Sequence, residues 1–454
     1  MKRATRILLV AVALLALGAA AAWAGPGGGS SGFGGGGGGG GGFSGGGGGG
    51  YSGGGGSGGS SGGGGIAFLI FVGAFFAFFL FSAVAAAFHV RRMRKRRDAR
   101  QRRVVLASAE AAADDAAFGA DEVRGEATAL LNLIVKAWTA RDRAALGRML
   151  GPDLMVEWNR RLDDFDRKGW HNICEIVDGP EVQYLGLVNR ADDADDRVTV
   201  RVWSRQRDIV RDSNGNTIKR NESTSEIVTS AEYWTLGKRE GRWVLLSIEQ
   251  DSEGAHHLDA DIVPTPWGDE DRLRDEAVTE LATADAIPDA AIAGVADLDF
   301  DGTARAAALD LAMVDGRFAP DVLEAAARQA VAARAEAVDG ADAALERAAT
   351  PGAVRELLYA GDASERTRLV VRGPRLKALR ITALHADATP PAMLVEADVS
   401  GRRYREDRDT AAVVEGSKKR EVAFTERWTM TLDGDEKTPW RIADAAGLAP
   451  PAAR

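Results

Sequence analysis

The sequence predicts an α+β protein with an N-terminal signal segment, one membrane span and two tandem cone-shaped domains of helices packed on a curved antiparallel sheet. Three observations predict it. The 25-residue segment Ile66–Val90 has no formally charged residue. Beyond it, apolar residues recur first at helical spacing and then at every second position. This plan then occurs a second time, and 454 residues are enough for two or three domains.

The N-terminus has the pattern of a signal peptide. Basic residues up to Arg6 precede the apolar run Ile7–Ala21, and Ala22-Trp23-Ala24 has the small-x-small form of a cleavage site. We therefore expect residues 1–24 to be a signal peptide. An uncleaved first membrane helix is the alternative.

Residues 25–65 form a glycine- and serine-rich tether. They hold 30 of the 55 glycines of the chain. Such a composition buries too little apolar surface to offset the conformational entropy lost on ordering, so we expect a disordered spacer. Its matches to the G-x-G-x-x-G motif do not indicate a nucleotide-binding loop, because no strand precedes them and no helix with a phosphate-binding N-terminus follows.

Ile66–Val90 is the predicted membrane span. A helix of 25 residues is about 38 Å long, against about 30 Å of hydrocarbon in a bilayer. A basic cluster follows at once, and the positive-inside rule then places the rest of the chain on the cytoplasmic side of a plasma membrane. The cluster consists of Arg91, Arg92, Arg94, Lys95, Arg96 and Arg97. We expect it to contact anionic lipid headgroups; a stop-transfer role alone is the alternative.

After a basic and alanine-rich helical linker at residues 91–120, we expect the first α+β domain at residues 121–251. Leu130, Ile134 and Trp138 share one face of a helix. A second amphipathic stretch, Leu154–Phe165, follows the break at Gly151-Pro152. Alternating apolar residues then predict the strands of an antiparallel sheet, around residues 182–184, 198–202, 227–236 and 244–248.

The same anchors recur downstream. Gly179-Pro180 is followed 54 residues later by Trp234, and Gly373-Pro374 is followed 54 residues later by Trp428. The common offset is 194 residues. We therefore predict a second, divergent copy of the domain at residues 302–450. Two unrelated α+β domains that share tryptophan-bearing strands are the alternative.

Charge limits the partners of both domains and of the acidic linker between them, residues 252–301. The formal net charge is −9, but +3 before Ile7 and +8 in Arg91–Arg103 leave −20 from Val104 onward. Nucleic-acid binding needs a basic face, so we discount DNA and RNA as partners. Cys174, as the single cysteine, excludes an internal disulfide and a site of several thiolates.

Several segments together resemble the Tim-forty-four-like family. They are the helix residues Leu130–Leu150, the stretch Glu175-Ile176-Val177, the charged strand Arg205–Asp212, and the strands that contain Trp234 and Trp243. The resemblance covers the first predicted domain and implies a fold like that of nuclear transport factor two. It also implies a membrane-associated binding module that contacts lipid or unfolded or translocating chains. It supplies no catalytic residue, and nothing here resembles the chaperone-binding segment of the mitochondrial member.

Two patterns could bind metal. Asp297–Gly302 copies the first half of an EF-hand loop, but Ala308 stands where a bidentate glutamate is needed. His256-His257, with Asp259 and Asp261, offers imidazole and carboxylate ligands. An acidic turn and a polar linker are the simpler interpretations. We therefore predict no metal and no cofactor.

Two further residues could carry chemistry. His171 follows Asp163, Asp164 and Asp166 closely and could form an acid–base pair with one of them, although such residues at a helix end are more often solvated or capping. Cys174, between isoleucines, should pack as a small apolar residue. Neither pattern is a catalytic signature.

The sequence thus favours a membrane-anchored binding scaffold, serving protein transport or lipid-linked assembly through protein partners. The alternative is a small-molecule enzyme or ligand binder that uses the cone pocket. We expect Trp158, Tyr184 and Trp203 to line that pocket. An enzyme would place two or more ionisable groups deep in the cone, whereas a binding module would line it with apolar side chains.

Overall fold

The computed structural model covers the chain from the predicted membrane span to the end of the second sheet. It describes residues 63–218, 226–284, 304–338 and 342–445, with the backbone alone for 63–80, Ala83, Arg305 and Val338. The predicted signal peptide (1–24), nearly all of the tether (25–65) and the EF-hand-like Asp297–Gly302 lie outside the described residues.

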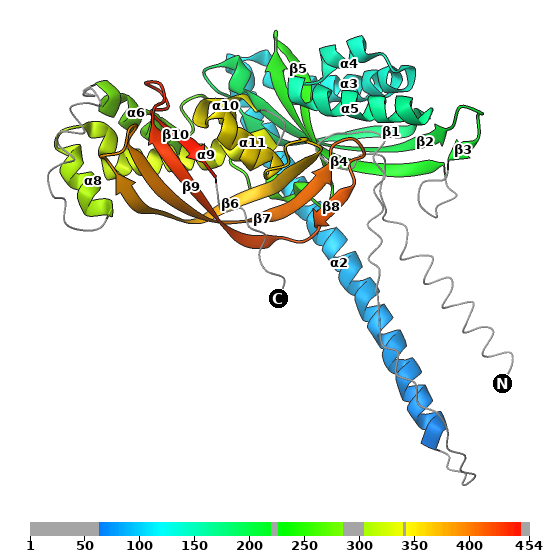
Figure 1. Cartoon of the computed structure of the whole chain (residues 1–454). Coiled ribbons are helices and arrows are strands. Elements are labelled where there is room, and N and C mark those ends of the chain that lie inside the picture. Colours follow the sequence, from blue (N-terminus) through cyan, green and yellow to red (C-terminus); the bar gives the residue numbers. More distant parts are fainter. Residues whose placement is uncertain (1–62, 219–225, 285–303, 339–341, 446–454) are drawn as a thin grey trace. The chain divides into compact units, whose positions relative to one another are not determined.

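Helix α2 (Gly63–Asp114) opens the described chain and is 52 residues long (Figure 1). It contains Ile66–Val90 and the whole basic cluster. In the cluster, Arg91, Arg92, Arg94 and Lys95 are exposed, whereas Arg96 and Arg97 are half-buried. Across the residues that the structure describes, none of the helices combines the length and the apolar character needed to cross a bilayer.

From Gln101 onward the described chain forms one compact unit. It contains a first domain (residues 101–263) and a second domain (residues 270–445), both α+β as the sequence predicts. The first domain contains, in order, η1 (Ala116–Phe118), α3 (Ala120–Ala140), α4 (Arg143–Met149), α5 (Pro152–Lys168), β1 (His171–Val188), η2 (Asp193–Asp195), β2 (Arg197–Arg211), β3 (Thr217–Ile218), β4 (Ile227–Arg239), β5 (Arg242–Gln250) and η3 (Gly254–Leu258).

Among the described residues, the second domain repeats this order of helices and strands after α6 and α8. It contains α6 (Glu270–Ala284), α8 (Ala304–Ala312), η4 (Gly316–Phe318), α9 (Pro320–Val338), α10 (Ala343–Ala348), α11 (Pro351–Tyr359), β6 (Thr367–His385), β7 (Ala392–Asp407), β8 (Val413–Gly416), β9 (Val422–Leu432) and β10 (Trp440–Asp444).

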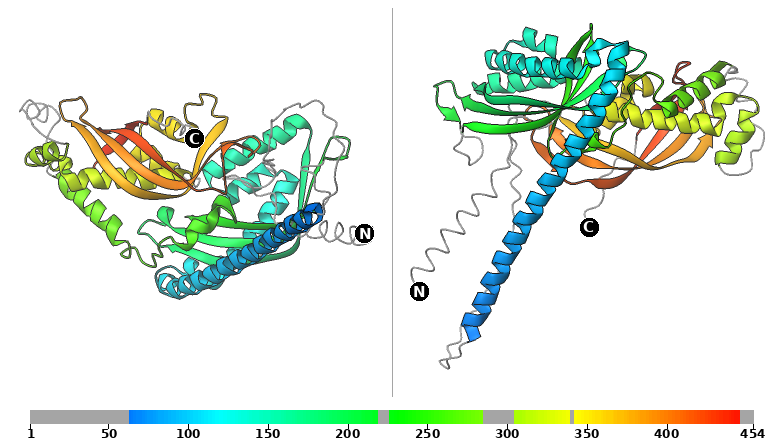
Figure 2. Two further views of the ribbon diagram at one scale, coloured as in Figure 1. Left: turned by 90° about the horizontal axis from the view of Figure 1, so that it is seen from below. Right: turned by 180° about the vertical axis from the view of Figure 1, so that it is seen from behind.

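The two sheets have the same topology. The first has the strand order β1-β2-β4-β5 with β3 paired to β2, and the second has the order β6-β7-β9-β10 with β8 paired to β7. All of these pairings are antiparallel. In the first domain the helices α3 to α5, and in the second α9 to α11, lie against one face of the sheet (Figures 1 and 2). An isolated parallel bridge also recurs, Leu150 with Leu245 and Ala349 with Ile442.

Local sequence explains where the helices begin and end. In α5, Pro152 occupies the first turn, where its missing N–H has no helical partner to lose. Gly169 ends the helix at φ 64°, a left-handed conformation that favours glycine. Arg167 and Lys168 lie in the last turn and oppose the negative end of the helix dipole. Helix α11 begins in the same way, with Thr350 as the cap before Pro351.

The turn η1 joins the segment before α3 to the core of the first domain. The Asp115 carboxylate accepts a hydrogen bond from the Ala117 N–H at 2.9 Å. Phe118 packs edge-on against Trp243, with ring centroids 5.3 Å apart, and the Trp243 indole N–H donates to the Ala117 carbonyl at 3.0 Å. Val104 is also in this core. The first domain therefore begins before the predicted boundary at residue 121, and the alanine-rich stretch is part of the fold rather than a linker.

The second domain contains the same arrangement 200 residues later. Asp315 accepts a hydrogen bond from the Arg317 N–H at 2.9 Å. Phe318 lies edge-on to Trp440 at 5.6 Å, and the Trp440 indole N–H donates to the Arg317 carbonyl at 2.9 Å. An Asp-x-x-Phe turn locked by a tryptophan from the last strand is thus common to both domains.

The two Gly-Pro pairs lie at equivalent irregularities of the long first strands. Pairing of β1 with β2 shifts register between Asp178 and Glu181, around Gly179, and pairing of β6 with β7 shifts between Arg372 and Arg375, around Gly373. Both glycines have positive φ, 87° and 55°. A bulge bends a strand and increases its twist, so these pairs curve the two sheets at the same place.

Much of the predicted acidic linker, residues 252–301, is folded. Leu258 and Val263 are buried, and the Val263 N–H donates to the carbonyl of Leu187 at 2.9 Å. Helix α6 packs on α9, where Arg328 donates to Asp275 at 2.7 Å. In the described part of this segment, residues 252–284, acidic side chains lie in ion pairs and exposed turns.

Buried charges connect the two domains. The pairs are Arg161–Glu406 (3.5 Å), Glu157–Arg368 (3.5 Å), Glu157–Arg408 (2.7 Å) and Glu249–Arg372 (3.6 Å), and each of these side chains is at most 6% exposed. The Tyr404 hydroxyl also donates to Glu253 at 2.6 Å. The contact between the domains therefore includes several buried ion pairs, with the first domain supplying most of the carboxylates.

Candidate functional site

The interior of the first domain is filled by aromatic side chains. Trp158 and Tyr184, two of the predicted pocket residues, are fully buried in the core, whereas Trp203 is only half-buried. Trp138 packs edge-on against Trp158 at 5.0 Å. Burial raises the pKa of Tyr184 well above its usual range. Trp158 and Tyr184 therefore serve as packing residues, and the pocket described below has none of the three in its lining.

Glu232 is the acidic group inside this first core. It lies on β4 and accepts a hydrogen bond from the Trp234 indole N–H at 3.0 Å. Burial raises the pKa of Glu232, and the hydrogen bonds from Trp234 and Ser230 offset only part of that effect. Glu232 is thus a buried carboxyl whose hydrogen-bond partners, Trp234 and Ser230, are neutral.

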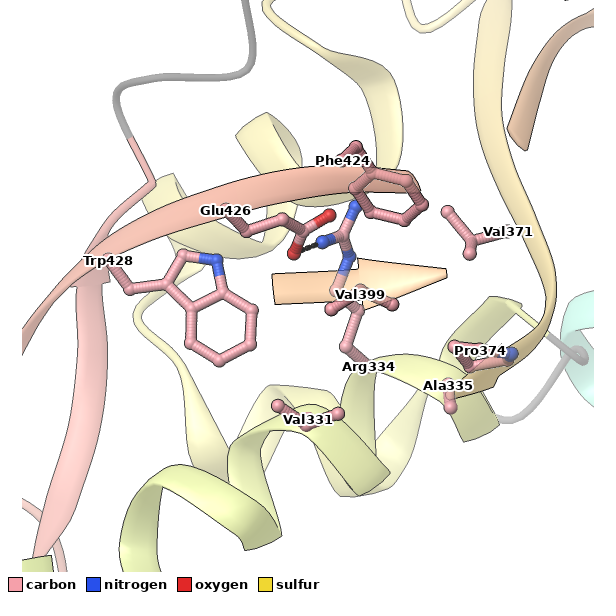
Figure 3. Close-up of a pocket in the computed structure, with 9 residues that line it drawn as sticks. All are labelled: Val331, Arg334, Ala335, Val371, Pro374, Val399, Phe424, Glu426 and Trp428. Atoms are coloured by element: carbon pink, nitrogen blue, oxygen red, sulfur yellow. Dashed lines mark ion pairs between the residues drawn. The ribbon is translucent and has the colours of Figure 1, made fainter. Parts of the chain in front are cut away.

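The second domain has a pocket at the corresponding place, between α9 and the concave face of its sheet (Figure 3). The cavity is small, with a volume of about 20 Å³. The apolar wall residues are Val331, Ala335, Val371, Pro374, Val399 and Phe424. Among them lie three polar side chains, Arg334 from α9 and Glu426 and Trp428 from β9.

Arg334 and Glu426 form an ion pair inside this pocket, and their side chains are only 6% and 2% exposed. Four other polar atoms of the group have no hydrogen-bond partner among the described residues: Nε and Nη2 of Arg334, Oε1 of Glu426 and Nε1 of Trp428. Burial, with the nearby charge of Arg403, lowers the pKa of Arg334 to about 9, so it stays charged at neutral pH. Leaving such a buried group unpaired costs about 1–3 kcal/mol.

Helix composition explains why the second interior, unlike the first, has an arginine beside its glutamate. Helices α3 and α9 start at residues 120 and 320 and follow the same Asp-x-x-Phe turn, so residues 200 apart are equivalent. The equivalent pairs facing the sheet are Leu130 and Ala330, Leu131 and Val331, Ile134 and Arg334, and Val135 and Ala335. Smaller residues on α9 leave space, and an arginine replaces an isoleucine beside the shared glutamate.

Sequence reasoning missed Arg334 and Glu426, although a signal was present. Glu426-Arg427-Trp428 matches Glu232-Tyr233-Trp234 at the offset of the repeat. Arg334 also interrupts a helical face made otherwise of alanine and valine. A buried glutamate opposite an arginine on a small-residue face is the pattern that marks this pocket.

The residues considered for acid–base chemistry, and judged more often solvated or capping, do not come together. His171 is exposed, and its Nε2 lies 2.8 Å from the Thr139 carbonyl. Asp163 and Asp166 instead pair with Arg143, at 2.7 and 3.0 Å. Cys174 is buried in the core, as expected for a small apolar residue.

The two adjacent histidines lie beside a carboxylate that the sequence did not single out. Nε2 of His256 and of His257 are each 2.8 Å from an oxygen of Glu249, whereas Asp259 and Asp261 are exposed. Burial alone would raise the pKa of Glu249, but the charges of His256, His257 and Arg372 together lower it well below its usual range. Because the Arg372 guanidinium lies 3.6 Å from this carboxylate, it already supplies the positive charge that a cation would bring.

Comparisons with known proteins identify part of this chain. No curated protein matches its sequence. Among solved structures, a crystal structure of the intermembrane space region of the chloroplast protein ARC6 is 11% identical and covers 28% of this chain and 95% of its own, with a TM-score of 0.23. A family model described as the Tim44-like domain matches residues 105–250. That range includes the end of α2 and the helices and sheet of the first domain, so the chain carries a Tim44-like domain, the family that its sequence resembles.

Proposed function

We propose that the chain is a membrane-anchored binding protein that presents its Tim44-like domain and the second, related domain at the cytoplasmic face of the plasma membrane. One observation carries the proposal. The residues matched by the family model continue directly from a helix whose preceding part holds an uncharged 25-residue segment and a basic cluster. Anchor, basic collar and domain thus follow one another without a break.

The composition of the chain around Ile66–Val90 supports a membrane anchor. Ile66–Val90 is long enough for a bilayer, and Arg91–Arg97 follows on one side only. Each base near an anionic leaflet adds about 1 kcal/mol of attraction. The chain from Val104 onward is acidic, so the cluster is the part suited to lipid headgroups, and the domains are suited to protein partners. Unfolded or translocating chains are the partners that the family resemblance suggests.

Binding is favoured over catalysis by the two domain interiors. The first is filled by packed aromatic residues. In the second, the ionisable groups lining the pocket are one oppositely charged pair, which neutralises itself. The acid–base pair that the sequence left open for His171 is not present among the described contacts. The pocket of the second domain supports the alternative function, the binding of a small molecule.

Orientation is tested by protease added to intact spheroplasts. We expect residues beyond Arg97 to be protected and to become sensitive only after the membrane is opened with detergent. Degradation of the two domains in intact spheroplasts, with a cytoplasmic marker still protected, would refute the orientation.

Partners are tested by crosslinking in cells, with a photoreactive amino acid at Val156 or Val177, two exposed apolar positions of the first domain that are 49% and 45% exposed. We expect defined protein adducts. The matched control places the same group at exposed Met313 in the second domain, 86% exposed, to separate specific capture from crowding. Identical capture at all three positions would contradict a specific protein partner.

Lipid contact is tested with the full chain in nanodiscs of mixed neutral and anionic lipid. Replacing the six bases of the cluster by glutamine should remove the enrichment of anionic lipid measured by mass spectrometry of the discs. Arg102 and Arg103, also exposed, provide the control pair. An equal loss of enrichment in the control would show that the cluster has no special role.

A further inference from the structure

We infer that His256 and His257 form a pH-sensitive switch at the contact between the two domains. Together they hold one proton against Glu249 near neutral pH, and uptake of a second proton separates the domains. This goes beyond the proposed binding function and does not depend on the membrane anchor or on any partner. It depends on the placement of two imidazoles around one buried carboxylate.

One carboxylate contacts both histidines. Nε2 of His256 lies 2.8 Å from Oε2 of Glu249, and Nε2 of His257 lies 2.8 Å from Oε1. The Glu249 side chain is only 1% exposed, so little water competes for these contacts. The two rings also lie against each other, with centroids 4.0 Å apart, and His257 stacks on Tyr233 at 5.7 Å. Protonation of one imidazole therefore acts directly on the other.

The carboxylate favours the first proton. A neutral imidazole donates to it through the Nε2–H, and an imidazolium adds the attraction of opposite charges at the same distance. Glu249 is present as the anion, because the neighbouring positive charges outweigh the effect of burial and hold its pKa well below its usual range. The pair should therefore bind its first proton more tightly than a free histidine, whose pKa is about 6.5.

The same surroundings oppose the second proton. A second imidazolium would lie 4.0 Å from the first, between ring centroids, and Arg372 already lies 3.6 Å from Oε1 of Glu249. Three positive charges would then face one carboxylate in a buried site, which is unfavourable. Glu253 is also buried here, but burial raises its pKa, which limits the negative charge that it can add.

The other charged groups around η3 contact Glu253, pair elsewhere or face solvent. Arg402 and Tyr404 of β7 donate to Glu253, at 3.2 and 2.6 Å, and Lys418 pairs with Glu406 at 2.7 Å. The acidic residues that follow η3, and those of β1, which also packs on η3, are exposed: Asp259, Asp261, Glu175, Asp178 and Glu181. Glu249 and Arg372 are therefore the buried charges that determine the protonation of the pair.

The pair lies where the two domains meet. Strand β6 of the second domain packs on η3, and a Cβ added at Gly373 would lie 2.6 Å from Cβ of His256, so only glycine permits this close approach. The neighbouring Arg372 is fully buried and donates to Ser247 of the first domain at 3.2 Å. Moving β6 away from η3 would separate Arg372 from a doubly protonated pair and admit water. The second proton therefore favours separation of the domains.

NMR of the full chain in detergent, with ¹³C-labelled histidine, tests the protonation from about pH 4 to pH 9. The two resonances are assigned by their loss in His256→Gln and His257→Gln. We expect two macroscopic steps more than about one pH unit apart, a difference of more than about tenfold in proton affinity, one above and one below about 6.5. His257→Gln should leave a single step above that value. A single unresolved step in the wild type, or two steps on the same side of 6.5, overturns the inference.

A distance between the domains tests the separation itself. Spin labels at Val177→Cys and Met313→Cys, two exposed positions in different domains, are placed in a Cys174→Ser background and measured by pulsed EPR. The distance should change as pH falls through the second step. His256→Gln/His257→Gln should remove that change with an unchanged circular dichroism spectrum, whereas His385→Gln, at an exposed histidine, should retain it. A distance that is independent of pH in the wild type, or that changes equally in the double variant, also overturns the inference.

Discussion

Glu157 offers the most direct test of how the two domains are held together. Its carboxylate is 4% exposed and lies 2.7 Å from Nε of Arg408 and 3.5 Å from Nη1 of Arg368, both in the second domain. Glu157→Gln keeps the shape of the side chain but removes the charge that both guanidinium groups face. Removing one partner of a buried ion pair costs about 3–5 kcal/mol when the remaining charge is left without compensation. Arg368 also pairs with Asp342 at 2.8 Å and Arg408 with Glu365 at 3.7 Å, so the loss falls at the lower end of this range. The folded fraction should fall by a factor of about 10²–10³ at the midpoint of the wild-type transition.

Urea unfolding followed by tryptophan fluorescence measures this loss on the full chain. Glu175→Gln is the matched control, because Glu175 pairs with Arg207 at the surface, where the two side chains are 61% and 43% exposed. Exposed pairs contribute about 0–1 kcal/mol, so the control should be nearly silent. Equal midpoints for the two variants would show that the charges between the domains do not stabilise the fold.

Further predictions concern the core and its titrating groups. Phe118→Ala should lower the free energy of unfolding by about 3–5 kcal/mol, whereas Leu133→Ala, at an exposed site, should change it by less than about 0.5 kcal/mol; thermal unfolding distinguishes them. Burial raises the pKa of Glu232 in the folded state. Its contribution to the free energy of unfolding is therefore fully present below the unfolded pKa of about 4.3 and is lost as pH rises through the folded pKa. Glu232→Gln should make the stability fall less steeply above pH ~4.3. For Glu249 the pH dependence has the opposite sign, because its pKa is lowered in the folded state. Its contribution to the free energy of unfolding is present above pH ~4.3 and is lost as pH falls through the folded pKa. Glu249→Gln should therefore reduce the loss of stability at acid pH. Urea midpoints across pH measure both.

The elements of the fold follow well from periodicity, and the boundaries of the domains do not. Alternation at Val198, Val200 and Val202 predicts a half-buried strand, and β2 pairs on both sides with these residues in the core. The stretch before α3 gave a weaker signal, since alanine is a good helix former whether it is buried or exposed. Ala111 is fully buried, yet no local pattern distinguishes it from an exposed alanine of the same helix.

The pocket could be predicted only in part from the sequence. Its size depends on the combined volumes of side chains that come from elements far apart along the chain. Large apolar residues such as Trp158 and Tyr184 indicate an interior position, and both are indeed fully buried. Whether such large side chains leave a cavity beside them depends on the size of the side chains that face them from another helix. In the second domain the alanines of α9 decide this, and their partners on β9 lie almost a hundred residues further along the chain.

The charged contact between the domains also bears on how many copies of the chain associate. Arg161, Glu157 and Glu249 lie on one half of a single polypeptide, and their counterparts Glu406, Arg368 and Arg372 lie on the other. Every one of these contacts can equally form between the first half of one molecule and the second half of another. Molecules anchored in a membrane, as proposed above, would meet at high local concentration, which would favour such an exchange over the same reaction in bulk solution. Reciprocal exchange of domains is therefore a low-cost route to a dimer.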